Sequence, residues 1–166
     1  MLVAVILTTV VFYICNYFYN LKELDVSKWK TYTNNDYGYS FEYPADLKID
    51  TMTSNLVNIE PYGSLPLKFS YSIQVDNNIG NVTGKERANG EYAYWKSAIF
   101  SPTTKVFISD ATVDGINGGK VTVTAQTDIK TMEEIYIVKN DKMYDFEGTN
   151  NQTLFDKIIS TFKFTK

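Results

Sequence analysis

Three acidic and amide side chains could bind a hard cation. Asp110, Asp114 and Asn117 follow one another closely, and carboxylate and carbonyl oxygens are the ligands that Ca²⁺ and Mg²⁺ prefer. Tight turns use the same residue types, and this spacing matches no calcium-binding loop. We therefore expect turn chemistry and no metal site here. The run Asp76-Asn77-Asn78 is likewise interpreted as a loop.

Residues for nucleophilic catalysis are scarce. The chain has no histidine, and its one cysteine, Cys15, precedes every charged residue. This excludes a Ser-His-Asp triad, a Cys-His pair and a Cys/His zinc site in the rest of the chain. Lys96 and Ser97 are helix neighbours that point in different directions, so they form a poor dyad. The sequence predicts no catalytic residue and no cofactor.

Two further kinds of site stay open. The 19 carboxylates allow a glycosidase-like acid pair in principle, although no spacing marks one. Tyrosines such as Tyr37, Tyr62 and Tyr94 could form a recognition patch, because tyrosine offers contact area at low entropic cost. Core packing and an AT-rich codon bias, typical of a low-GC bacterium, explain the 13 tyrosines more simply.

The charge of the chain argues against nucleic acid as a partner. The net charge is −3, with 16 basic and 19 acidic residues. Nucleic-acid binding needs a basic patch, and the sequence shows none.

The elements that carry these residues follow an apolar N-terminal segment. Residues 1–21 contain no charged side chain, and a helix of that length spans on the order of 30 Å, close to the hydrocarbon core of a bilayer. We expect a single transmembrane anchor at residues 1–20, a linker at 21–28 and one domain at 29–166. A cleaved signal peptide fits less well because no basic residue precedes the apolar run. Acylation at Cys15 also fits less well, because Ile14 stands where a small residue is expected.

The orientation of this anchor is open from the charges alone. Lys22, Lys28 and Lys30 follow the apolar run, and no basic residue precedes it. Read literally, the positive-inside rule would place the domain in the cytoplasm.

Strands dominate the remaining chain. Tyr39–Tyr43 alternates aromatic and polar residues and ends at Pro44, as a half-buried strand does. Asn55–Glu60 and Leu67–Val75 are predicted as two further strands. Thr104–Val113 and Lys120–Asp128 are predicted as an antiparallel pair joined by residues 114–119.

The clearest hairpin surrounds Asn140-Asp141. Both residues tolerate positive φ, as a two-residue type I′ turn requires. The register pairs Ile137 with Tyr144 and Tyr136 with Asp145. Both faces are largely apolar, so we expect this hairpin at the centre of the sheet, covered on both sides.

Two helices are expected beside these strands. Glu91–Phe100 is one, with a start that Gly84 and Gly90 leave uncertain. The other begins at Asn150 or Asn151 and presents Leu154, Phe155, Ile158, Ile159 and Phe162 as one stripe. A last short strand is predicted at 162–164. Together these elements predict an α+β domain with an antiparallel sheet and helices packed on it.

Three stretches resemble bacterial PsbP-like domains. They are Trp29–Pro44 (WKTYTNNDYGYSFEYP), the turn Asp114–Lys120 (DGINGGK) and the ending Leu154–Phe164 (LFDKIISTFKF). The resemblance covers residues 29–166 and implies an α/β/α sandwich. It also implies an exported domain, since the bacterial members are mostly exported and often lipid-anchored. The motifs are structural, so they bear on fold more than on function.

These observations predict a membrane-tethered, non-enzymatic interaction domain that faces the extracytoplasmic side. It would dock on a membrane or cell-surface complex. A small-ligand or ion-binding module is the alternative, followed by a carboxylate-based hydrolase.

Overall fold

The computed structural model describes residues 26–61, 70–98, 103–125 and 130–165. The predicted anchor at 1–20, Cys15 and Tyr62 lie outside these ranges, as does most of the predicted linker. Within them, no helix has the length and apolarity needed to cross a membrane.

Seven antiparallel strands form the large sheet, in the order β3-β4-β5-β9-β8-β7-β6. Their bounds are β3 Leu47–Thr53, β4 Leu56–Pro61, β5 Ser70–Asn77, β6 Lys105–Val113, β7 Ile116–Ala125, β8 Lys130–Lys139 and β9 Lys142–Thr149. A second, three-stranded sheet has the order β1-β2-β10, with β1 Lys30–Asn34, β2 Tyr39–Tyr43 and β10 Lys163–Phe164. A short 3-10 helix, η1 (Val26–Lys28), precedes β1.

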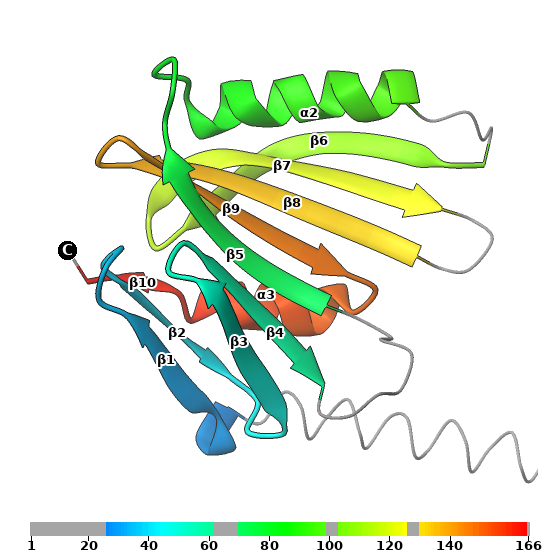
Figure 1. Ribbon diagram of the computed structural model, residues 1–166. Helices are drawn as coiled ribbons and strands as arrows, with labels where there is room; N and C mark the ends of the chain where they lie inside the picture. The colour runs from blue at the N-terminus through cyan, green and yellow to red at the C-terminus, as the bar shows by residue number, and fades with distance from the viewer. Residues whose placement is uncertain (1–25, 62–69, 99–102, 126–129, 166) are drawn as a thin grey trace, which may run out of the picture.

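Two helices cover opposite faces of the large sheet (Figure 1). Helix α2 (Gly84–Ala98) packs on β6, β7 and β8. Helix α3 (Gln152–Ser160) contacts both β9 of the large sheet and β2 of the small sheet. The α+β architecture predicted from the sequence is confirmed, but the strands form two sheets where one was expected.

The main core lies between the two sheets and α3. It is rich in aromatic side chains, and Phe162 stacks on Tyr39 with their ring centroids 5.1 Å apart. A smaller core lies under α2, where Ala88 packs with Val121, Tyr136 and Met143. Burial of these apolar surfaces supplies the main driving force for folding.

The β8–β9 hairpin matches its prediction. Asn140 and Asp141 have φ of 51° and 58°, and Ile137 pairs with Tyr144 as the register required. The strands occupy the middle of the large sheet. The C-terminal helix is also confirmed, with Asn151 as its N-cap: its side chain accepts a hydrogen bond from the backbone N–H of Leu154.

The predicted boundaries of the β6–β7 connection and of helix α2 are wrong. The β6–β7 connection is a two-residue turn at Asp114-Gly115, with φ of 47° and 78°, so β7 begins at Ile116. Residues 116–119 were assigned to the connection because they contain glycine, although Asp-Gly is itself a strong hairpin signal. Helix α2 begins at Gly84, before the predicted start at Glu91.

The early start of α2 has a local cause. Thr83 and Glu86 form a capping box: Thr83 Oγ1 accepts from the backbone N–H of Glu86 at 3.1 Å, and Glu86 Oε2 accepts from the backbone N–H of Thr83 at 2.7 Å. This satisfies two backbone donors at the helix start.

Candidate functional site

The residues considered for a cation site do not converge. Asp110 pairs with Lys85 of α2, with 2.6 Å between Oδ1 and Nζ. Asp114 accepts hydrogen bonds from Lys163 Nζ at 2.8 Å and from the backbone N–H of Phe164 at 2.9 Å. These contacts, with Lys163 first, lower the pKa of Asp114. Asp110 and Asp114 therefore stabilise local structure through these contacts, as is usual for acidic residues near a turn.

The other sequence candidates also have structural roles. Asn117 accepts a hydrogen bond from Thr112 Oγ1 at 3.0 Å. Ser97 Oγ donates to the carbonyl of Tyr94 in its own helix at 2.8 Å, so it forms no dyad with Lys96. Asp76 and Asn77 belong to strand β5, so the loop predicted at these residues begins only at Asn78. Asn77 Oδ1 accepts a hydrogen bond from Lys142 Nζ of the neighbouring strand β9. Within the described ranges, no three acidic, histidine or cysteine side chains are placed to hold a metal ion.

Four carboxylates meet on the face of the large sheet that α2 covers. Glu134 of β8 lies directly opposite Glu147 of β9. Asp145 shares that face of β9, because side chains two residues apart point the same way, and it lies opposite Tyr136. Glu91 is contributed by α2. We call Glu91, Glu134, Asp145 and Glu147 the acidic face.

One arginine and one tryptophan contact the acidic face. Arg87 Nη2 lies 2.8 Å from Glu91 Oε1, and its guanidinium lies over the ring of Tyr136, 5.6 Å from the centroid. Trp95 Nε1 donates to Glu134 Oε2 at 3.1 Å. The three carboxylates on the strands (Glu134, Asp145 and Glu147) have no cation within salt-bridge distance in the part of the chain that the structure describes.

The electrostatics of this face are unusual. Burial, followed by repulsion from Glu134 and Glu147, raises the pKa of Asp145 to about 7, and Arg87 opposes this rise. Burial also raises the pKa of Glu134, although its hydrogen bond from Trp95 works against the rise. One oxygen of Asp145, Oδ1, is buried without a hydrogen-bond partner among the described residues.

This arrangement has two chemical capacities. It can hold a proton on Asp145 near neutral pH, because burial and neighbouring carboxylates disfavour the charged form. It also attracts a cationic group, because Glu134 and Glu147 repel each other across the strand pair and a positive charge would relieve that repulsion. Sequence reasoning missed the acidic face although its signal was present. The register predicted for the β8–β9 hairpin already pairs Tyr136 with Asp145, and its extension by two residues pairs Glu134 with Glu147.

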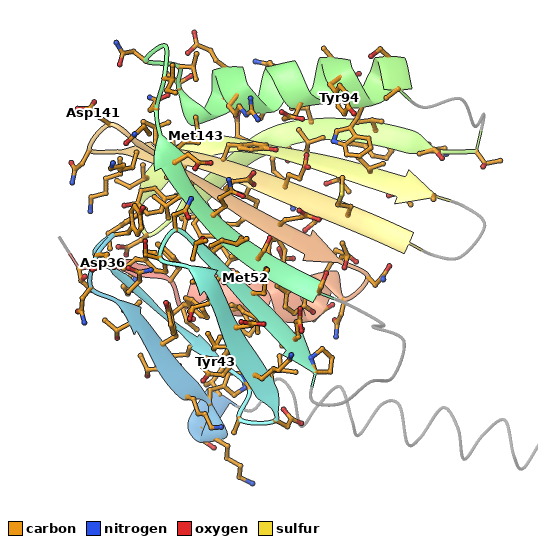
Figure 2. All side chains as sticks on the ribbon, viewed as in Figure 1. Asp36, Tyr43, Met52, Tyr94, Asp141 and Met143 are labelled. Atoms are coloured by element: carbon orange, nitrogen blue, oxygen red, sulfur yellow. The ribbon has the colours of Figure 1, made fainter. Side chains whose placement is uncertain are left out.

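The structure also has open hollows at one end of the sheets. The β1–β2, β3–β4 and β8–β9 turns gather there, and Figure 2 places Asp36 and Asp141 at this same end. One hollow of about 430 Å³ is lined by Asp36, Tyr37, Ser54, Asn140, Lys142 and Tyr144. No carboxylate of the acidic face lines it, so the hollow and the acidic face are separate features.

Of the tyrosines considered for recognition, Tyr37 and Tyr94 lie within the described residues. Tyr37 is half-buried, and its carbonyl accepts a hydrogen bond from Tyr144 Oη at 3.0 Å. Tyr94 is 58% exposed on α2, where Figure 2 shows it far from Asp36. The two therefore form no common patch.

No protein-family model and no curated protein sequence matches the chain. Its structure is similar to solved structures. The solution structure of the PsbP protein CyanoP from Synechocystis has a TM-score of 0.55 at 12% identity, covering 84% of this chain and 94% of that one. The Ran-binding protein Mog1p of Saccharomyces cerevisiae has a TM-score of 0.52 at 10% identity, covering 83% and 96%.

Two bacterial structures are also similar. LpqN of Mycobacterium tuberculosis, involved in cell envelope biogenesis, has a TM-score of 0.50 at 13% identity, covering 83% of this chain and 91% of that one. A Bacteroides thetaiotaomicron protein has a TM-score of 0.53 at 11% identity over 84% of this chain, which spans about half (49%) of its length. At such identities the likeness shows the fold alone. That fold is PsbP-like, as the resemblance implied.

Proposed function

We propose that this chain is a non-enzymatic interaction domain, tethered to the cell membrane by residues 1–20 and facing the extracytoplasmic side. It docks through the acidic face on a protein partner whose matching surface is basic.

The acidic face is the observation that carries this proposal. Glu134 and Glu147 oppose each other beside Asp145, and folding gains nothing from that arrangement. Local choices that conflict with stability are expected at functional sites. A lysine or arginine supplied from outside would relieve the repulsion between Glu134 and Glu147.

The known roles of similar structures agree with a binding function. Mog1p is a Ran-binding protein, and LpqN is involved in cell envelope biogenesis. An acid pair for hydrolysis would need a cleft that admits substrate to both groups. Trp95 occupies one oxygen of Glu134, and neither Glu134 nor Asp145 lines the three hollows at the turns of β1–β2, β3–β4, β8–β9 and β6–β7. These facts favour docking over catalysis.

Cross-linking of the full-length chain on intact cells tests the proposal. A membrane-impermeant amine-reactive cross-linker should join the chain to a discrete partner, identified after purification. The double variant Glu134→Gln, Glu147→Gln should reduce that capture at least about tenfold, because close interfacial charge pairs contribute more than 1.4 kcal/mol. The matched control is Asp156→Asn, an exposed charge on α3, which should leave capture unchanged.

Three outcomes would contradict parts of the proposal. Equal capture by the double variant removes the acidic face from the interface. Capture only with a membrane-permeant reagent shows that the domain faces the cytoplasm. The absence of any reproducible partner with either reagent rejects the docking function.

A further inference from the structure

The outer edge of β6 is an unprotected sheet edge. β6 runs for nine residues, and its register with β7 continues without a bulge from Lys105 to Val113. No other described strand pairs with it. Long regular edges of this kind present a row of free backbone donors and acceptors to another strand.

The opposite edge of the same sheet is protected. The register of β3 shifts between Asp50 and Thr53, and such irregularities twist an edge away from pairing. The strand's exposed residues are mostly polar, Met52 excepted. The two edges therefore differ, and only β6 keeps a regular geometry that another strand could extend.

The β6 edge carries apolar side chains on both faces. Phe107 is 55% exposed and Ile108 is 37% exposed, and they are consecutive, so they point to opposite faces of the sheet. Val106 lies on the same face as Ile108. A strand added at this edge would cover both side chains at once, whereas a partner lying on a single face would cover one.

The turn geometry fixes which backbone groups point outward. Val113 and Ile116 flank the two-residue turn and pair with each other, and this first pair of the hairpin is a hydrogen-bonded pair. Hydrogen-bonded and non-hydrogen-bonded pairs then alternate along the two strands. Odd-numbered residues of β6 therefore bond to β7. Val106, Ile108 and Asp110 direct their N–H and C=O groups to the free edge.

We propose that the β6 edge pairs with β6 of a second copy of this chain, antiparallel about a two-fold axis through Phe107. This register places Phe107 against its symmetry mate and Val106 against Ile108 of the second copy. Lys105 then faces Ser109, and Asp110 faces Thr104. Every exposed apolar side chain of the strand gains an apolar neighbour, and no like charges oppose each other.

An axis through Val106 opposes Phe107 to Lys105, and the two registers shifted toward Asp110 are also worse. An axis through Ile108 opposes Val106 to Asp110, and an axis through Ser109 opposes Ile108 to Asp110. Each of these places an apolar side chain against a carboxylate. The self-match at Phe107 is therefore the argument for a second copy as the occupant, since an isologous interface must be complementary to itself.

Cysteine cross-linking of the full-length chain tests the register. In a Cys15→Ser background, Phe107→Cys places two sulfurs across a non-hydrogen-bonded pair with Cα atoms about 4.5 Å apart, within reach of a disulfide. Mild oxidation in detergent should convert most of this variant to a covalent dimer. Ser109→Cys is the matched control, because its copies lie about 13 Å apart along the strands and should remain uncross-linked.

Sedimentation equilibrium in density-matched detergent tests the association itself. The wild-type chain should approach twice the mass of one chain as concentration rises, and Phe107→Lys should weaken dimerisation at least tenfold by placing two like charges on the axis. Met52→Lys is the control, since Met52 is 71% exposed on β3, the opposite edge strand of the sheet, and it should dimerise as the wild type does.

Two results would overturn the proposal. One is a wild-type chain that stays monomeric at all concentrations. This result would overturn the proposal even if a strand from another protein pairs with β6. The other is a dimer that Phe107→Lys leaves intact. Cross-linking through Ser109→Cys in preference to Phe107→Cys would overturn the register.

Discussion

Asp145 is held in an environment that disfavours its charge. Its pKa is raised from the ordinary value of 3.8 to about 7 by burial and by Glu134 and Glu147. The folded protein therefore binds a proton that the unfolded chain has lost between about pH 4 and pH 7, and stability must fall as pH rises through that range. The full penalty, on the order of 2–4 kcal/mol, is present above pH 7.

Replacing this carboxyl by a neutral amide should remove the penalty. We expect Asp145→Asn to raise the free energy of unfolding at pH 8 by on the order of 2–4 kcal/mol and to change it little at pH 4. Urea unfolding at a series of pH values measures this. Asp156→Asn, which removes an exposed charge on α3, is the control and should shift stability by less than about 0.5 kcal/mol. A wild-type stability that rises from pH 5 to pH 8, with no effect of Asp145→Asn, would contradict the electrostatic account.

The acidic face illustrates what the sequence could and could not predict for single residues. The opposition of Glu134 and Glu147 followed from the hairpin register. The burial of Asp145 did not, because burial depends on how the elements pack in three dimensions. Trp95 lies within the predicted helix, but its hydrogen bond to Glu134 depends on how α2 packs on the sheet.

Helix α2 contains two glycines with opposite roles. A Cβ at Gly84 would collide with the backbone carbonyl of Tyr136 on β8, whereas a Cβ at Gly90 would meet nothing within 4 Å. Gly84 therefore permits the close approach of helix and sheet, while Gly90 only lowers helix propensity.

These two glycines give a matched pair of variants. We expect Gly90→Ala to increase the free energy of unfolding by about 0.5–1 kcal/mol. Gly84→Ala should decrease it by about 1–3 kcal/mol, because the helix must move off the sheet. Thermal unfolding followed by circular dichroism measures both. If both alanines stabilise the protein, the helix does not pack as closely on Tyr136 as the structure describes.

Strands differed in how well their sequence predicted them. β2, β8 and β9 alternate or carry apolar residues and were found. β1 and β3 were missed because each is exposed over much of its length, and a strand that buries few side chains shows little alternation. β3 reads as a strand only through its pairing with β4, which is information from the fold.

The whole molecule depends on joining two sheets that no sequence pattern connects. The PsbP-like resemblance implied the sandwich, but the second sheet and its contacts appear only in three dimensions. Phe162 lies at this junction. Its ring centroid lies 5.1 Å from that of Tyr39 in the small sheet and 4.9 Å from that of Phe146 in the large sheet. The last residues of the chain thus close the core between sheets formed earlier in the sequence.

Truncating Phe162 should therefore destabilise both sheets together. Phe162 is 1% exposed, and Phe162→Ala should lower the free energy of unfolding by about 3–5 kcal/mol.

Two tryptophans report on separate regions, since Trp29 packs on the main core and Trp95 on the smaller core under α2. In single-tryptophan variants (Trp29→Phe or Trp95→Phe), urea unfolding followed by fluorescence should give coincident midpoints that Phe162→Ala lowers equally. Met52→Ala is the control, because its side chain is 71% exposed and its loss should cost less than about 1 kcal/mol. A Trp29 midpoint that falls while that of Trp95 stays constant would show that the two cores unfold independently. The small sheet and α3 would then be a separate cooperative unit, and α2 with its acidic face would not need them to hold its shape.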